Sequence, residues 1–114
     1  MYKFGEIYFA NLPVQPDSRV QQGLRPVLVV SNDKNNYYST VVSVVPLTSS
    51  CTKHNLPTHV TLNGFGLSKP SIALCEQIMP LDKHRLMEKV GTIDSKKVFN
   101  LLQRAMMVQL NMAA

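Results

Sequence analysis

Residues 26–47 read PVLVVSNDKNNYYSTVVSVVPL, and this stretch decides the expected fold. It holds two short, almost continuous β-branched runs, Pro26 to Asn32 and Thr40 to Leu47, separated by the turn-forming residues 31–36. Apolar runs of this length without polar alternation are typical of strands that are buried on both faces. We therefore expect two neighbouring central strands at the heart of a sheet.

Shorter segments on both sides add further strands around this centre. Aromatic and β-branched residues predict a first strand over Lys3 to Ala10, and the polar segment from Val14 to Leu24 is expected to be a surface loop. A glycine-containing turn, residues 63–66, joins two strands of a predicted hairpin. These later elements are the hairpin strands Thr58 to Leu62 and Ser71 to Met79, a helical turn over Pro80 to Leu86, and a brief strand over Glu88 to Gly91.

One long helix is expected at the end of the chain. Its apolar residues recur at the i, i+3, i+4 and i+7 positions of one helix face. Asp94 is the expected N-cap, with Ile93 and Val98 forming a hydrophobic staple around it. Short strands followed by one terminal helix predict a single mainly β (α+β) domain over residues 1–114, with a small, strongly curved sheet or a partly open barrel.

The composition limits the partners of such a domain. Of the 114 residues, 45% are hydrophobic and 17% are charged, as in an ordinary globular domain. Lys and Arg outnumber Asp and Glu by 12 to 7, and the net charge of +5 favours phosphate polyanions or acidic proteins as partners. Few cysteines, no signal-peptide pattern and no apolar run of membrane length predict a cytoplasmic protein without membrane contact.

The common cofactor and nucleophile motifs are missing from the sequence. Cys51, His54 and His59 would supply at most three zinc ligands, and no second ligand pair follows, so we expect no metal site. Glycine-rich phosphate loops and a Gly-x-Ser-x-Gly motif are absent as well. We therefore expect no cofactor.

Polar residues beside the central strands form the candidate site. Arg25 stands between the loop and a buried strand, and Thr48 occupies the equivalent place after the next strand, so adjacent strands could bring the two together. Otherwise Arg25 is an ordinary exposed or ion-paired arginine, and Thr48 is a turn-capping hydroxyl. Glu76 and Gln77 interrupt an apolar strand, where one of them must face the core side and find a partner. A guanidinium, a hydroxyl and an amide together would suit a phosphodiester.

At these residues the sequence resembles the MazF/PemK family of toxin endoribonucleases from bacterial type II toxin–antitoxin pairs. Two blocks carry most of the resemblance, GLRPVLVVSND over residues 23–33 and EQIMPLDKHRL over residues 76–86. Shorter matches are GEIY over residues 5–8, LTS over residues 47–49 and LPTHV over residues 56–60. The resemblance covers nearly the whole chain.

This resemblance implies an SH3-like barrel of the MazF/CcdB type that works as a homodimer and cuts single-stranded mRNA without a metal. Arg25 and Thr48 match the catalytic arginine and threonine of the family. Gln77 and Arg85 match residues that contact the RNA, and Ser49, beside Thr48, is expected there too. The 2′-oxygen of the RNA attacks the phosphorus, which leaves a 2′,3′-cyclic phosphate and a 5′-hydroxyl. The family also implies an acidic antitoxin as partner, and operator DNA only indirectly, through the toxin–antitoxin complex.

One loop departs from the family pattern. Many relatives carry Ser-Glu-Gln-Gly-Gly before the arginine, whereas this chain reads SRVQQG over residues 18–23, without a glutamate. This difference removes a carboxylate that could act as a base. We therefore expect Arg19, Gln21 and Gln22 to contact the RNA instead.

The general base and the activity itself stay open at this level. Arginine remains protonated at neutral pH, so the base would be solvent or one of the two histidines His59 and His84. Two other functions remain: a non-enzymatic gyrase poison resembling CcdB, and a barrel that binds RNA without cutting it. Tyr37 and Tyr38 could stack on bases or simply pack within the fold.

Overall fold

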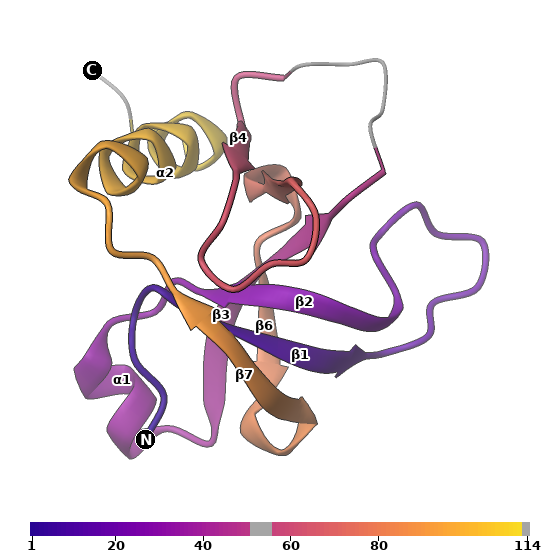
Figure 1. Ribbon diagram of the computed structural model, residues 1–114. Helices are drawn as coiled ribbons and strands as arrows, with labels where there is room; N and C mark the ends of the chain where they lie inside the picture. Colours follow the sequence, from indigo (N-terminus) through magenta and orange to yellow (C-terminus); the bar gives the residue numbers. More distant parts are fainter. Residues whose placement is uncertain (51–55, 113–114) are drawn as a thin grey trace.

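The computed structural model describes residues 1–50 and 56–112 (Figure 1). These ranges contain seven strands, two α-helices and two short 3-10 turns. The strands are β1 (Glu6–Leu12), β2 (Gly23–Val29), β3 (Val41–Thr48), β4 (His59–Leu62), β5 (Ser71–Leu74), β6 (Met79–Asp82) and β7 (Leu86–Thr92). The helices are α1 (Asp33–Tyr38) and α2 (Lys96–Gln109), and the 3-10 turns are η1 (Cys75–Gln77) and η2 (Lys83–Arg85).

The strands form one antiparallel sheet that is organised around β3. Along one edge β3 pairs with β2. Along the other edge its first half pairs with β6, and its last residues, Leu47 and Thr48, pair with β5. The strand path runs β4-β5-β3-β2-β1-β7, so in the described part of the chain it is open between β4 and β7. The expected mainly β fold with a C-terminal helix is confirmed.

The central strands are buried on both faces, as the β-branched runs predict. Val27 and Val29 of β2 belong to one apolar cluster, whereas Leu28 belongs to the other, which also contains Leu102 and Ala105 of α2. Each face of the sheet therefore has its own core, and α2 covers only one of them. This two-sided burial explains why the strands show no polar alternation.

A short helix, α1, replaces part of the turn that was expected over residues 31–36. Asn32 caps α1, because its side-chain oxygen accepts a hydrogen bond from the backbone N–H of Asn35 at 2.8 Å. Asn36 is completely buried, and its amide donates to the carbonyl oxygen of Ser31 at 2.9 Å. Polar hydrogen bonds stabilise this helix, so no apolar periodicity marks it in the sequence.

The strand predicted over residues 71–79 is interrupted by η1. The backbone N–H of Cys75 donates to the carbonyl oxygen of Thr58 at 3.1 Å, and the chain turns before β6 begins. Glu76 and Gln77 lie in this turn and are both half-buried. The prediction that one of them faces the core from within a strand was therefore wrong. The apolar residues before and after this turn belong to two separate strands, but in the sequence they look like one uninterrupted strand.

Several element ends also differ from the expected ones. β1 and β2 both extend towards the loop between them, which is shortened to residues 13–22. The helical turn predicted over residues 80–86 is confined to η2, and β7 is longer than the expected strand over residues 88–91. Strand pairing extends these strands beyond their apolar stretches, which is why the sequence pattern alone does not mark their ends.

The start of α2 is shifted by one residue. Ser95 is the N-cap, and its hydroxyl accepts a hydrogen bond from the backbone N–H of Val98 at 3.3 Å. With Ser95 rather than Asp94 as the cap, Ile93 and Val98 no longer occupy the staple positions, so that prediction was wrong. Within the two described ranges, no helix has the length and the apolar character that crossing a membrane requires.

Candidate active site

Arg25 and Thr48 lie close together on the paired strands β2 and β3. The antiparallel register aligns Val27 with Pro46, and the same register continued by two residues would bring Thr48 opposite Arg25. Both side chains line a hollow of about 480 Å³. The prediction that neighbouring strands bring this guanidinium and this hydroxyl together is confirmed.

The guanidinium of Arg25 is anchored at its inner end. Its Nε donates to the carbonyl oxygen of Gln22 at 3.0 Å, and the side chain is half-buried. Neither ion pair found among the described residues involves Arg25. The anchoring bond fixes the direction of the side chain and leaves the terminal nitrogens to bind an anion in the hollow.

Thr48 ends β3 and is almost completely buried, with 6% of its surface exposed. Its Oγ1 accepts a hydrogen bond from the backbone N–H of Ser50 at 3.1 Å. The hydroxyl therefore caps the turn after β3, as the simpler interpretation of the sequence proposed. Because it acts as an acceptor in that bond, its own proton stays available for donation into the hollow.

Two glutamines join the β1–β2 loop to η1 on the opposite wall. The backbone N–H of Gln21 donates to Oε1 of Gln77 at 2.8 Å. This bond leaves the amide NH₂ of Gln77 as a donor. The side-chain oxygen of Gln21 is buried and has no hydrogen-bond partner in the described structure. An unpaired buried amide oxygen is costly, so this group is suited to accept a hydrogen bond from a ligand.

His59 and Glu76 form a hydrogen-bonded pair beside Gln77. Nε2 of His59 lies 2.9 Å from Oε2 of Glu76, and the hydroxyl of Thr58 donates to Oε1 of the same carboxylate at 2.9 Å. Nδ1 of His59 accepts from the backbone N–H of Leu56 at 3.4 Å, which assigns the ring proton to Nε2. His59 thus lines the hollow, but both of its ring nitrogens already have partners.

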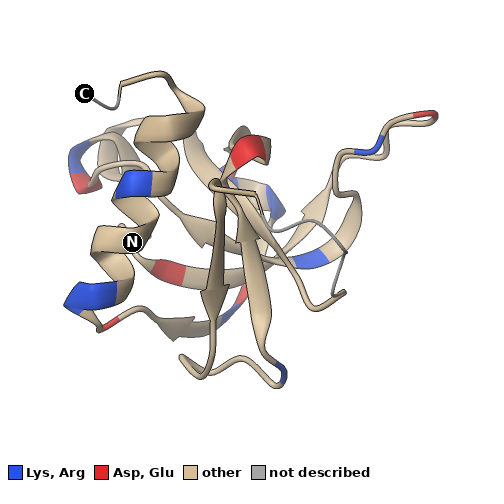
Figure 2. Cartoon of the chain, turned by 90° about the horizontal axis from the view of Figure 1, so that it is seen from above, with Lys and Arg blue, Asp and Glu red and all other residues tan. Residues whose placement is uncertain are grey.

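The β1–β2 loop contributes one more cation. Figure 2 shows this loop projecting from the sheet with one basic and one acidic residue, which are Arg19 and Asp17. Arg19 lines the hollow. Gln22 does not, because its side chain bridges the loop: its Oε1 accepts from the backbone N–H of Gln15 at 2.9 Å, and its Nε2 donates to the carbonyl oxygen of Ser18 at 3.3 Å. Gln22 therefore shapes the loop from within.

The remaining predicted residues lie outside this hollow. Ser49 is exposed and lines a neighbouring hollow together with Arg25. Arg85 and His84 are on η2, where Nη1 of Arg85 donates to the carbonyl oxygen of Asn11 at 2.9 Å. Tyr37 and Tyr38 lie on α1, pack edge to face and are both exposed, away from the hollow. The fold thus brings together Arg25, Thr48, Arg19, Gln21, Gln77 and His59.

A metal site or a thiol nucleophile is not supported by the described residues. Cys51 and His54 lie outside the ranges that the structure describes, and of the zinc candidates only His59 can be placed. No group of three His, Cys, Asp or Glu side chains suited to a metal occurs within residues 1–50 and 56–112. Burial raises the pKa of the Cys75 thiol to about 12, and the negative charge of Glu76 adds to this effect, so the thiol stays protonated.

Two arginines, two hydroxyl residues and two glutamine amides line one hollow together with the His59–Glu76 pair. The cations and hydrogen-bond donors among them suit a phosphodiester. The chain matches, over residues 3–109, a family described as PemK-like, MazF-like toxins of type II toxin–antitoxin systems. It belongs to this family. The family that the sequence motifs predicted is thereby confirmed.

Relatives agree with this assignment in sequence and in structure. The chain is 42% identical over 101 residues to the endoribonuclease MazF of Staphylococcus saprophyticus, covering 86% of this chain and 82% of that protein. MazF of Deinococcus radiodurans superposes with a TM-score of 0.81 at 25% identity, covering 97% of each chain. A mycobacterial endoribonuclease solved in complex with its cognate antitoxin has the same fold, with a TM-score of 0.81 at 23% identity over 100% of this chain and 99% of that one.

The hollow also contains residues that sequence reasoning did not assign to the candidate site. Glu76, Ser50, Leu56 and Leu74 line the hollow with the predicted residues. Glu76 had one signal, its position next to Gln77 in an otherwise apolar stretch. The others carry no chemical signal in the sequence, because only the fold brings the ends of β3 and β5 and the segment before β4 to the same hollow.

Proposed function

We propose that this chain is the toxin of a type II toxin–antitoxin pair and an endoribonuclease that cuts single-stranded mRNA at selected sequences, without a metal. The observation that carries the proposal is the shared hollow of Arg25 and Thr48, in a chain whose relative at 42% identity is named an endoribonuclease. A positive net charge of +5 supports a polyanionic substrate.

In the proposed reaction the RNA supplies its own nucleophile. The 2′-oxygen bonds to the adjacent phosphorus while the bond from phosphorus to the 5′-oxygen breaks, which leaves a 2′,3′-cyclic phosphate and a 5′-hydroxyl. Arg25 stabilises the charge that builds on the phosphoryl oxygens, and Thr48 donates a hydrogen bond that orients the group. Both roles need only donors that are held in place, and the two side chains are held by Gln22 and Ser50.

The proton of the 2′-hydroxyl goes to solvent in this proposal, and another is returned to the departing 5′-oxygen. His59 is the histidine at the hollow, but its Nε2 proton is engaged by Glu76 at 2.9 Å. His84 is outside the hollow, so it has no role in the step that we propose. Arg25 stays charged and is suited to stabilisation of the phosphoryl group, not to proton abstraction.

Cleavage of a long single-stranded RNA in the presence of EDTA tests the activity. We expect cuts at one short recurring motif, with 5′-hydroxyl ends that accept a label from polynucleotide kinase without prior phosphatase treatment. Intact RNA would contradict the proposal, and accumulation of gyrase–DNA adducts with intact RNA would favour the gyrase-poison alternative.

Two substitutions test the assignment of Arg25 and Thr48. Arg25→Ala should lower kcat at least about a hundredfold, because it removes a charged donor to the phosphoryl group. Thr48→Val keeps the shape and removes only the hydroxyl, and it should also reduce kcat about tenfold or more. Circular dichroism and thermal unfolding serve as folding controls, and full cleavage by a folded Arg25→Ala variant would show that the assignment is wrong.

We also propose the partners of this toxin. Structures of family members with a cognate antitoxin support an antitoxin for this chain, and its positive charge favours an acidic one. The active form is a homodimer in the cytoplasm, and contact with operator DNA occurs only through the toxin–antitoxin complex. Sedimentation of the purified chain should show a species of twice the 12.8 kDa chain mass.

A further inference from the structure

A second hollow lies beside the one around Arg25 and Thr48. The second hollow has a volume of about 400 Å³, and Arg25 lines both. Ser49 and Lys69 line this second hollow and also line a third one, which has a volume of about 410 Å³. Each volume is in the range of about 300–1,000 Å³ that is usual for small-molecule sites. Shared lining residues therefore place the three hollows in a row, with the candidate active site at one end.

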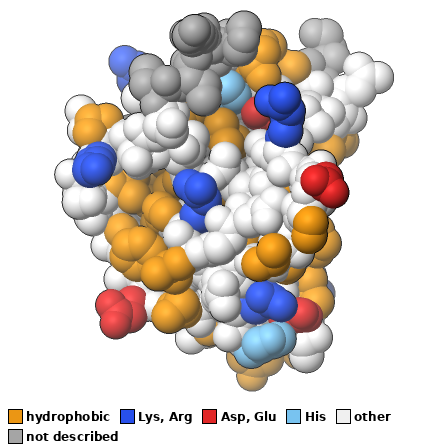
Figure 3. Space-filling model, turned by 90° about the vertical axis from the view of Figure 1, so that its right-hand side faces the viewer, with side chains coloured by type: hydrophobic (Ala, Val, Ile, Leu, Met, Phe, Trp, Pro, Cys, Tyr) orange, Lys and Arg blue, Asp and Glu red, His pale blue; other side chains and the backbone are white. Residues whose placement is uncertain are grey.

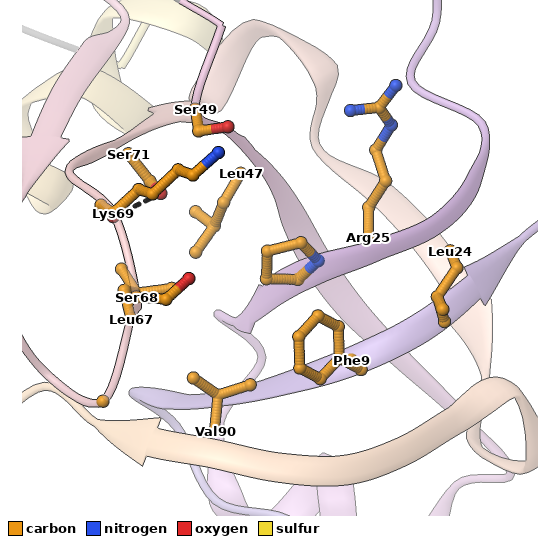
Figure 4. A pocket seen from close by; sticks show the side chains of 12 residues that line it. Phe9, Leu24, Arg25, Leu47, Ser49, Leu67, Ser68, Lys69, Ser71 and Val90 are labelled. Atoms are coloured by element: carbon orange, nitrogen blue, oxygen red, sulfur yellow. Dashed lines mark hydrogen bonds between the residues drawn. The ribbon is translucent and has the colours of Figure 1, made fainter.

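The second hollow has the residues expected of a nucleotide subsite. Figure 4 shows Lys69 and Arg25 on opposite sides, with Ser49 beside the amino end of Lys69 and the ring of Phe9 lower in the hollow. Its lining contains no acidic residue. Phe9 is 41% exposed and its neighbour Leu24 is 63% exposed, so apolar surface stays open beside the two cations.

The wall that carries Lys69 is fixed to the sheet. Gly66, in the β4–β5 loop, and Gly91, on β7, approach so closely that a Cβ on either would lie within about 2 Å of a backbone oxygen of the other segment. The hydroxyl of Ser71 also donates to the carbonyl oxygen of Lys69 at 3.1 Å. Lys69 is thus presented by a closely packed loop.

We propose that the second hollow binds a nucleotide next to the cleaved bond, with Lys69 on its phosphate and its base stacked on Phe9. This subsite rests on the proposed ribonuclease function and extends it to residues outside the catalytic hollow. Single-stranded binding sites combine basic side chains along the backbone with exposed aromatic rings, and this hollow contains both. Figure 3 shows basic side chains and an apolar patch together on the face that carries the β1–β2 loop.

RNA is favoured over a protein segment as the occupant because Arg25, which we assign to the phosphoryl group, also lines this hollow. A strand that crosses from Thr48 towards Ser49 passes two cations in succession, Arg25 and then Lys69. Two cations met one after the other suit the repeated charge of a phosphate backbone. Leu24 and Phe9 then provide apolar surface for a base rather than for another phosphate.

The test uses short RNAs that carry the cleavage motif mapped on the long RNA. One has extra nucleotides on both sides of the motif, and two others are trimmed on one side each. We expect trimming on one side to raise the KM of the wild-type protein about tenfold. Lys69→Ala and Phe9→Leu should each raise KM by a similar factor on the full RNA, change kcat less than twofold, and have no effect on the RNA trimmed on that side.

Lys34→Ala is the matched control, because it removes the same charge from α1, which lines none of these hollows. Lys69→Ala should also reduce the slope of log(kcat/KM) against log salt by about 0.7, the value for one phosphate contact on a single strand. Lys34→Ala should leave that slope unchanged.

Three results would overturn the subsite. Lys69→Ala could behave like Lys34→Ala on every RNA, trimming could have no effect on either side, or the two subsite variants could keep wild-type kinetics and lose only neutralisation by the antitoxin. The last result would assign the hollow to the protein partner. If the wild-type protein cuts no RNA, the ribonuclease proposal itself fails, and this outcome is distinct from all three.

Discussion

His59 and Glu76 contact each other in the wall of the candidate hollow, and this contact favours a positioning role for His59 over a general-base role. Its Nε2 proton binds Oε2 of Glu76 at 2.9 Å, and the side chain is only 6% exposed. Glu76 adjoins Gln77, whose Oε1 binds the β1–β2 loop at Gln21. Losing the donor from His59 would leave a carboxylate short of a partner and loosen η1 beneath the loop.

His59→Gln and His59→Ala separate this positioning role from general-base catalysis. Glutamine can keep an N–H donor towards Glu76, so kcat/KM should stay within about threefold of wild type and its pH profile should keep its shape. Alanine provides no such donor, so kcat/KM should fall about tenfold. If His59 were the general base, both variants would lower kcat/KM by about 10²–10⁴-fold and would remove the acidic limb of its pH profile. That result would contradict the positioning role.

Sequence reasoning found the residues that carry charge or hydrogen bonds next to a strand, but it could not find their partners. Arg25 and Thr48 were predictable because each directly adjoins a β-branched run. The pairing of His59 with Glu76 links residues 17 positions apart on β4 and η1, and no spacing rule predicts it. Gln22 shows the reverse case, since its side chain is used inside the loop and does not reach the hollow.

At the scale of elements, the β4–β5 loop and β7 are joined by close backbone contact at two glycines. A Cβ on Gly91 would lie 1.9 Å from the carbonyl oxygen of Phe65. Gly91→Ala should therefore push the loop off β7 and cost about 3 kcal/mol of unfolding free energy. Gly64→Ala, in the same loop, meets no atom within 4 Å and strains only its φ of +97°, so it should cost about 1 kcal/mol. Urea unfolding measures both, and an equal or smaller loss at Gly91 would contradict the steric explanation.

Elements held by apolar packing were the predictable ones. β2 and β3 follow from the two runs in residues 26–47, because burial on both faces leaves a clear signal. α1 and η1 were missed, since a buried asparagine stabilises one and a single backbone bond to Thr58 starts the other. Hydrogen-bonded turns use residues that are common in any loop, so composition does not distinguish them.

At the scale of the whole molecule, sequence motifs predicted the fold and the family, but not the path of the surface hollows. The charge of +5 indicates an anionic partner without locating it. Three neighbouring hollows are lined in turn by residues of the β1–β2 loop, the end of β3 and the β4–β5 loop. The walls of these hollows depend on loop packing, including the contact between Gly66 and β7, which only the folded chain defines.

The stability of the whole molecule should depend on pH through Glu6, which links the start of the chain to the last strand. Burial by itself would raise the pKa of Glu6, but hydrogen bonds from Lys89, Tyr8 and the backbone N–H of Lys3 outweigh burial and hold that pKa below its ordinary value of 4.5. A carboxylate with a lowered pKa in the folded state stabilises the protein above its unfolded-state pKa, and this stabilisation is lost as the pH falls through the folded-state pKa.

Glu6→Gln should therefore lower the unfolding free energy at pH 7 by about 1–2 kcal/mol, because it removes a charged acceptor of three hydrogen bonds. The difference from wild type should shrink as the pH falls below about 4.5, since protonated Glu6 then resembles the amide. Urea unfolding between pH 3 and pH 7 measures this dependence. Glu88→Gln, on the exposed side of β7, is the matched control and should change stability by less than about 0.5 kcal/mol. If Glu6→Gln lowered the unfolding free energy by the same amount at every pH, the shape of the Glu6 side chain would matter and its charge would not.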